Sequence, residues 1–89
     1  MAVFIVAYDL NTPGKTYSEL IAEIKKLQNC KPQKSLWFVE WSGTRTALRD
    51  KLGAHIDSND TLLVSQVFKQ CWASSNMAAC AGWLEARGL

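Results

Sequence analysis

Asp9 is the residue of this chain best placed to do chemistry. It closes the segment Val3–Asp9, whose other positions are apolar or aromatic. Such a segment is typical of a strand in the middle of a sheet that is covered on both faces. Reactive groups of α/β sheets gather outside the strand ends, so Asp9 is the candidate catalytic residue. The alternative is a turn in which its carboxylate binds backbone amides near Asn11.

Other polar residues favour structural roles. Asp57 and Asp60 flank a turn cluster that lacks the central glycine and the closing glutamate of a calcium loop. Glu40 lies in an otherwise apolar segment and either pairs across the sheet or faces solvent. His55 is the single histidine, so no histidine cluster exists for zinc. No serine triad and no glycine-rich phosphate loop is present.

The cysteines predict a reducing compartment. Cys30, Cys71 and Cys80 are widely spaced, form no C-x-x-C pair and are odd in number, which argues against a disulfide framework. The apolar N-terminal stretch has no preceding basic region and ends in an acid, so we interpret it as a strand and not as a signal peptide. No apolar run is long enough to span a membrane. A cytoplasmic protein without membrane contact is expected.

Charge and aromatic content leave two kinds of partner open. The net charge is only +2, which excludes a strongly basic nucleic-acid coat but not a local basic face. Trp37 and Trp41 could stack bases, but we expect them to fill the core and a subunit interface. The basic side chains that could contact RNA or DNA are Lys15, Lys34, Arg45 and Arg49.

The hydrophobic periodicity predicts an alternation of strands and helices. A capping box of Thr16 and Glu19 opens a helix that is expected to end at residues 29–31, ahead of Pro32. Extended structure follows over residues 33–41, as one long strand or a bent pair. The remaining elements are a helix over about 45–54, a strand over 61–68 and a short C-terminal helix within 74–88.

This order predicts one α+β domain over residues 1–89, with a single sheet and its helices on one face. The natural arrangement is ferredoxin-like, the split β-α-β fold, plus the C-terminal helix. The opposite face would remain bare although alternate residues of an apolar strand lie on it. A two-fold homodimer would cover it.

Three short motifs suggest a family. They are Tyr8-Asp9-Leu10, Gln33-Lys34-Ser35-Leu36-Trp37-Phe38 and Asp60-Thr61-Leu62-Leu63-Val64. In order and spacing the chain resembles the small CRISPR-associated protein that partners the spacer integrase, and its stand-alone relatives, which include virulence-associated toxin-like ribonucleases. The resemblance covers residues 3–67 and excludes the tail. Only Lys15 stands where the CRISPR proteins carry a basic pair, and Lys31-Pro32 replaces a glycine, which places the chain among the diverged stand-alone relatives.

The resemblance implies a homodimer in which Asp9 of both subunits faces a divalent cation. Two carboxylates form a hard-oxygen site that suits Mg²⁺ or Mn²⁺. The implied activity is metal-dependent endonucleolytic cleavage of RNA or DNA. The alternative hypothesis is a non-enzymatic dimeric module that binds and regulates a protein, nucleic acid or nucleotide partner.

Overall fold

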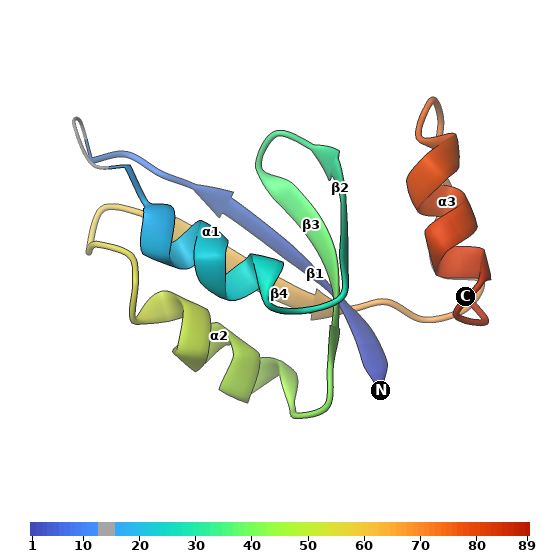
Figure 1. Ribbon diagram of the computed structural model, residues 1–89, viewed down its shortest axis with the longest axis horizontal. Helices are drawn as coiled ribbons and strands as arrows, with labels where there is room; N and C mark the ends of the chain where they lie inside the picture. Colours follow the sequence, from blue (N-terminus) through green and yellow to red (C-terminus); the bar gives the residue numbers. More distant parts are fainter. Residues whose placement is uncertain (13–15) are drawn as a thin grey trace.

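Strands and helices alternate along the chain, which is described by a computed structural model over residues 1–12 and 16–89. The elements of these residues are shown in Figure 1. In chain order they are β1 (Ala2–Asp9), α1 (Ser18–Lys25), β2 (Asn29–Gln33), β3 (Leu36–Trp41), α2 (Arg45–Gly53), β4 (Thr61–Gln66) and α3 (Ala78–Glu85).

The strands form one antiparallel sheet in the order β2-β3-β1-β4. β1 is central: Val6 pairs with Trp37 of β3 on one side and with Val64 of β4 on the other. The apolar character of β1 follows from this position, because both of its faces pack against other elements. The predicted α+β domain with a single sheet is confirmed.

Helices α1 and α2 cover the first face of the sheet. Even-numbered residues of β1, such as Phe4 and Val6, point to this side because side chains alternate along a strand. The helices bury one apolar stripe each against them. The fully buried core side chains on this face are Phe4, Val6, Leu20, Ile24, Val39, Leu48 and Leu52.

The C-terminal tail covers part of the second face, which we expected to be bare until a second subunit bound it. α3 lies near the end of the sheet at which β1 begins (Figure 1). Cys80 and Leu84 of α3 form a second core cluster with Val3, Phe38 and Val67. The remainder of this face is less covered, and Leu63 of β4 is 61% exposed.

A disulfide between Cys30 and Cys80 joins β2 to α3, with an S–S distance of 2.07 Å. The prediction of reduced thiols is therefore wrong, and the ground for expecting a cytoplasmic location is lost with it. The odd cysteine count is explained by Cys71, which is free and exposed. An ion pair between Arg87 and Glu40, at 2.5 Å, ties the tail to β3 a second time.

The first helix departs most from expectation. Tyr17, in the left-handed region with φ 55°, precedes Ser18, and no side chain of the described residues caps the helix, so the predicted capping box is wrong. The helix ends at Lys25, and Asn29–Gln33 forms β2. Pro32 is accommodated because β2 is an edge strand. The two residues between β2 and β3 form a bend, so the extended region predicted over residues 33–41 belongs to a bent pair of strands and not to one long strand.

The second helix agrees with its prediction. Thr44 is the N-cap, and its hydroxyl accepts a hydrogen bond from the backbone N–H of Ala47 at 3.1 Å. β4 begins at Thr61, as predicted, and ends two residues earlier, at Gln66. Within the described part of the chain, no helix has the length and apolar character needed to cross a bilayer.

Candidate functional site

Asp9 is the last residue of β1 and is exposed. It pairs in register with Thr61 of β4, and the alternation of side chains places it on the second face together with Ile5 and Ala7. Its carboxylate makes no hydrogen bond or ion pair with any residue of the described ranges. The alternative role as a turn-forming acid is therefore not what the structure shows, and Asp9 is open to an external ligand.

The turn-forming role belongs to Asp60. The residue is only 9% exposed. Oδ1 accepts hydrogen bonds from the phenol of Tyr17 and from the backbone N–H of Asn11, both at 2.7 Å. Oδ2 accepts from the backbone N–H of Asp57, also at 2.7 Å. These bonds fix the chain that follows β1 against the turn that precedes β4, and so hold the strand end that carries Asp9.

One chain supplies a single carboxylate at this position. Among the described residues, no group of three or more His, Cys, Asp and Glu side chains is arranged to hold a metal ion. Asp60 precedes Thr61, the register partner of Asp9, but its oxygens already accept hydrogen bonds from Tyr17 and two backbone amides. A carboxylate-bound Mg²⁺ or Mn²⁺ at Asp9 would therefore require a second ligand from outside this chain.

An apolar groove lies on the same face as Asp9. It has a volume of about 270 Å³ and separates the sheet from the segment that follows β4. Phe68, at its rim, is 56% exposed. The apolar side chains that line the groove include Ile5, Leu36, Phe38, Phe68, Trp72 and Met77. Asp9 is four residues from Ile5 along β1, roughly 13 Å at the rise of a strand, so the groove and the acid are separate features of one face.

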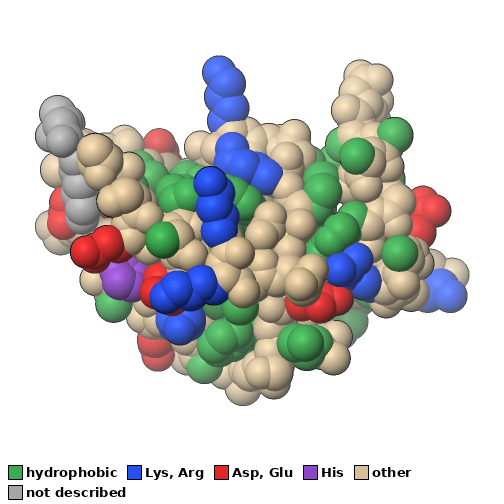
Figure 2. All heavy atoms as spheres, viewed as in Figure 1, with side chains coloured by type: hydrophobic (Ala, Val, Ile, Leu, Met, Phe, Trp, Pro, Cys, Tyr) green, Lys and Arg blue, Asp and Glu red, His purple; other side chains and the backbone are tan. Residues whose placement is uncertain are grey.

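The candidate basic residues are not gathered in one place. Arg45 and Arg49 of α2 line a common hollow beside Val64. Lys34 lies in the turn before β3, whereas Arg45 follows that strand, so roughly 20 Å of extended chain separates them. Lys15 lies outside the described residues. Figure 2 shows Lys and Arg side chains scattered over the visible face rather than forming a basic patch.

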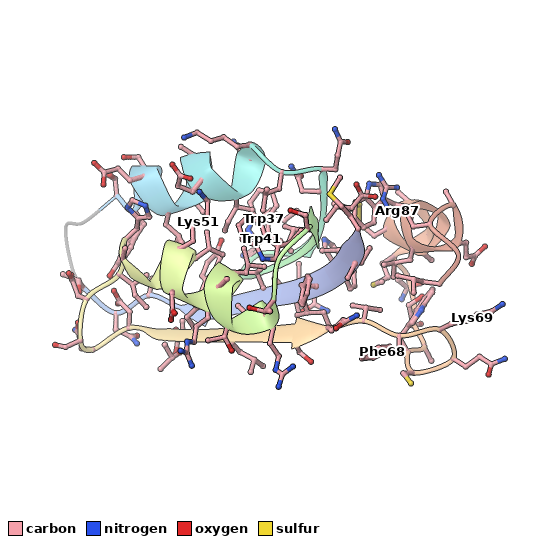
Figure 3. All side chains as sticks on the ribbon, turned by 90° about the horizontal axis from the view of Figure 1, so that it is seen from below. Trp37, Trp41, Lys51, Phe68, Lys69 and Arg87 are labelled. Atoms are coloured by element: carbon pink, nitrogen blue, oxygen red, sulfur yellow. A yellow bond between two sulfur atoms is a disulfide. The ribbon has the colours of Figure 1, made fainter. Side chains whose placement is uncertain are left out.

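The two tryptophans of β3 have different surroundings. Trp37 is buried in the first-face core, and its Nε1–H donates to the Tyr8 hydroxyl at 3.0 Å. Trp41 is partly buried, and its Nε1–H donates to the carbonyl of Thr44 at 3.0 Å, beside the start of α2. Figure 3 shows both labelled side chains on the side of β3 that faces α1 and α2. Neither ring lines that groove.

A polar cavity of about 360 Å³ lies beside the start of α1, and no pattern in the sequence indicated it. Its walls come from the N-terminal turn of α1 and from residues 54–57 after α2. Nδ1 of His55 is 3.3 Å from Oε2 of Glu19 across this cavity. The two residues are far apart in sequence, and only the packing of α1 beside α2 brings them together.

No family model matches the chain, and no solved structure matches it.

Proposed function

We propose that this protein acts as a homodimer that cleaves phosphodiester bonds of RNA or DNA with the help of Mg²⁺ or Mn²⁺. In this proposal the open part of the second sheet face is the dimer interface, and Asp9 of both chains lies at it. The observation that carries the proposal is the position of Asp9: exposed, without a side-chain partner in the described residues, and on the same face as exposed apolar side chains.

The unburied apolar surface supports a dimer interface on this face. Leu63 and Phe68 are 61% and 56% exposed. Phe68 lines the apolar groove together with Ile5, and Leu63 pairs in register with Ala7 on the same face. An apolar surface of this kind is commonly covered by a partner. A two-fold axis would place the same patch of each copy against the other, and so would bring the two copies of Asp9 to one interface.

The type of donor atom that Asp9 offers supports a bound divalent cation shared by two chains. Carboxylate oxygens are the donors that Mg²⁺ and Mn²⁺ prefer, but the described residues of one chain contain no group of three or more candidate ligands. A second copy would supply the second carboxylate. When bound, such a cation neutralises charge on a phosphate and lowers the pKa of a coordinated water. The role of Asp9 is to hold the ion at the interface, and that of Asp60 is to fix the strand end.

The ferredoxin-like classification is part of this proposal. It is supported by the strand order β2-β3-β1-β4 and by helices that connect β1 to β2 and β3 to β4 on one face of the sheet. The three motifs that resemble the CRISPR-associated family and its stand-alone ribonuclease relatives support the same assignment. In the structure, two of them meet at the same end of the sheet: Asp9 closes β1 where Asp60 and Thr61 open β4.

The test is a nuclease assay on single- and double-stranded RNA and DNA with Mg²⁺ or Mn²⁺, combined with sedimentation equilibrium. We expect Asp9→Asn to abolish cleavage and leave the dimer intact. Leu63→Glu should separate the subunits and abolish cleavage as well. Asp50→Asn is the matched control, because it neutralises an exposed carboxylate on α2. Wild-type activity in Asp9→Asn would contradict the mechanism, and a monomeric wild type would contradict the interface.

A non-enzymatic dimeric module is the second candidate. It is favoured by the finding that no group of three metal-binding side chains exists among the described residues. This candidate predicts a well-folded dimer that binds a protein, nucleic acid or nucleotide without turnover and is insensitive to chelators. A steep salt dependence of binding would identify the ligand as a nucleic acid, and a weak one would favour a protein.

A further inference from the structure

β4 forms an open edge of the sheet, and its sequence does nothing to block it. The residues of β4 are Thr-Leu-Leu-Val-Ser-Gln, without charge or proline. The opposite edge, β2, contains Lys31 and Pro32 and is linked to α3 by the disulfide. Proteins usually protect edge strands with such devices, because an open edge pairs with other extended chains. The contrast between the two edges marks β4 as a pairing site.

The register identifies which backbone groups face outward. The backbone N–H of Val67 donates to the carbonyl of Val3 at 2.9 Å, so the odd-numbered residues of β4 exchange their backbone bonds with β1. In an antiparallel ladder the intervening residues direct their N–H and C=O groups to the other side. Leu62, Val64 and Gln66 therefore present their backbone groups to the open edge.

Two hollows lie along this edge, between α2 and β4. One is lined by Leu62 with Arg49, Asp50, Gly53 and Ile56, and the other by Val64 with Arg45, Thr46 and Arg49. Figure 3 shows α2 running above β4. Leu62 and Val64 are two residues apart, or roughly 7 Å, which is also the spacing of alternate side chains on one face of an added strand. Such a strand would direct alternate side chains towards both hollows.

The charges beside the hollows specify what those side chains should be. Arg45 has no ion-pair partner among the described residues, and Arg49 is bonded only to its exposed neighbour Asp50, at 2.9 Å. An exposed pair of this kind contributes little stability and is readily exchanged. Arginine suits carboxylates because its guanidinium can donate two parallel hydrogen bonds. Pairing with β4 of a second copy would instead bring like charges of two α2 helices together, which is unfavourable.

We propose that the β4 edge binds an extended segment of a partner protein that carries acidic side chains at alternate positions. The segment adds to the sheet through the outward backbone groups of Leu62, Val64 and Gln66. Its carboxylates pair with Arg45 and Arg49. This site is distinct from Asp9 and from the second-face groove, so it does not depend on the proposed nuclease activity or on that dimer interface.

The first test uses a short fluorescent peptide in which Glu alternates with Val and Thr, measured by fluorescence anisotropy with the full chain. We expect saturable binding that falls at least about tenfold when both arginines are changed to Glu, or when Lys replaces Glu in the peptide. Lys34→Glu is the matched control for Arg45→Glu alone, because each reverses one charge and Lys34 lies at the opposite end of β3; it should leave affinity within about twofold. Absence of saturable binding, or equal binding of the Lys peptide, would overturn the proposal.

The second test addresses the backbone pairing. Val64→Pro removes one outward N–H but none of the bonds to β1. Proline is tolerated in an edge strand at such positions, where the N–H would face solvent. We expect this variant to retain its circular dichroism spectrum and to lose the peptide. A peptide with N-methyl groups on alternate amides provides the same test on the unaltered protein. It should not bind when the methylated amides are those that would face β4. Full binding in both cases, or self-association through β4 that displaces the peptide, would contradict a peptide-binding edge.

Discussion

The phenol of Tyr17 donates a 2.7 Å hydrogen bond to Oδ1 of Asp60, and so joins residues that lie 43 positions apart in the sequence. The same carboxylate accepts the backbone N–H groups of Asn11 and Asp57. One nearly buried acid thereby fixes the end of β1, the start of α1 and the start of β4. Asp9, exposed at the end of β1, relies on this arrangement for its position.

The two acids at this end of the sheet should respond differently to neutralisation. Asp60→Asn replaces one acceptor oxygen by an N–H₂ group that cannot accept the existing backbone bonds, and we expect a loss of about 1–3 kcal/mol in the free energy of unfolding. Asp9→Asn should change it by less than about 0.5 kcal/mol, because the side chain is exposed. Urea unfolding of both variants measures the contrast, and equal losses would show that Asp9 is also structural.

Tyr17→Phe tests the contribution of the phenol hydroxyl to this network. The ring remains in the core and only the hydroxyl is removed, together with its bonds to Asp60 and to the backbone N–H of Thr12. We expect a loss of about 1–2 kcal/mol, smaller than that of Asp60→Asn. The same urea experiment measures it. A variant as stable as the wild type would show that water replaces the phenol at no cost.

The Cys30–Cys80 disulfide should contribute strongly to stability. It closes a sequence separation of 50 residues, and cross-links of this size typically stabilise the native state by about 2–4 kcal/mol, chiefly by restricting the unfolded chain. Cys80→Ser, or reduction of the wild type, should lower the melting temperature, whereas Cys71→Ser should not, because Cys71 is free and exposed. Insensitivity of the wild type to reductant would contradict a formed disulfide.

Sequence patterns located the elements that are determined by local interactions. The helix predicted over about 45–54 is α2, and its N-cap bond, from the Ala47 N–H to the Thr44 hydroxyl, is a local contact three residues away. The uninterrupted apolar run of β1 predicted a central strand, because only a strand covered on both faces is apolar throughout. The position of Asp9 at the end of that strand followed directly.

The features that were missed depend on contacts between distant residues. The carboxylate of Asp60 attracts Tyr17 and Asn11 across more than forty residues, and no local spacing shows this. Thr16 and Glu19 have the spacing of a capping box, yet the left-handed conformation of Tyr17 replaces it and directs the phenol to Asp60. The pairing of Cys30 with Cys80 requires α3 to fold back on β2, which an odd cysteine count does not indicate.

The N-cap of α2 gives a prediction about local stability. Thr44→Ala removes the acceptor for the Ala47 N–H and should lower the free energy of unfolding by about 1 kcal/mol. Thr44→Ser keeps a hydroxyl at the same position and should restore most of this loss. Urea unfolding compares the two. Because the carbonyl of Thr44 also accepts the Trp41 indole N–H, which both variants retain, tryptophan fluorescence of the folded state should stay unchanged.

Glu23 gives the protein a pH-dependent link between its two first-face helices. Its carboxylate accepts hydrogen bonds from Lys26 at 2.7 Å and pairs with Lys51 of α2 at 3.3 Å, and these bonds hold the pKa of Glu23 below its ordinary value of 4.5. A depressed folded-state pKa adds stability that is fully present above the ordinary pKa and is lost as the pH falls through the lower folded value.

We therefore expect the stability difference between wild type and Glu23→Gln to be constant near neutral pH. It should vanish as the pH falls below the ordinary pKa of 4.5 and through the lower pKa of the folded state. Urea unfolding across a pH series measures the difference, and a carboxyl titration by NMR measures the pKa of Glu23 directly. Added salt should reduce both effects, because the pair is close to solvent. Glu85→Gln is the control, since Glu85 is an exposed acid without an ion pair in the described structure. A pKa of Glu23 at or above 4.5 would show that Lys26 and Lys51 do not hold its carboxylate in solution.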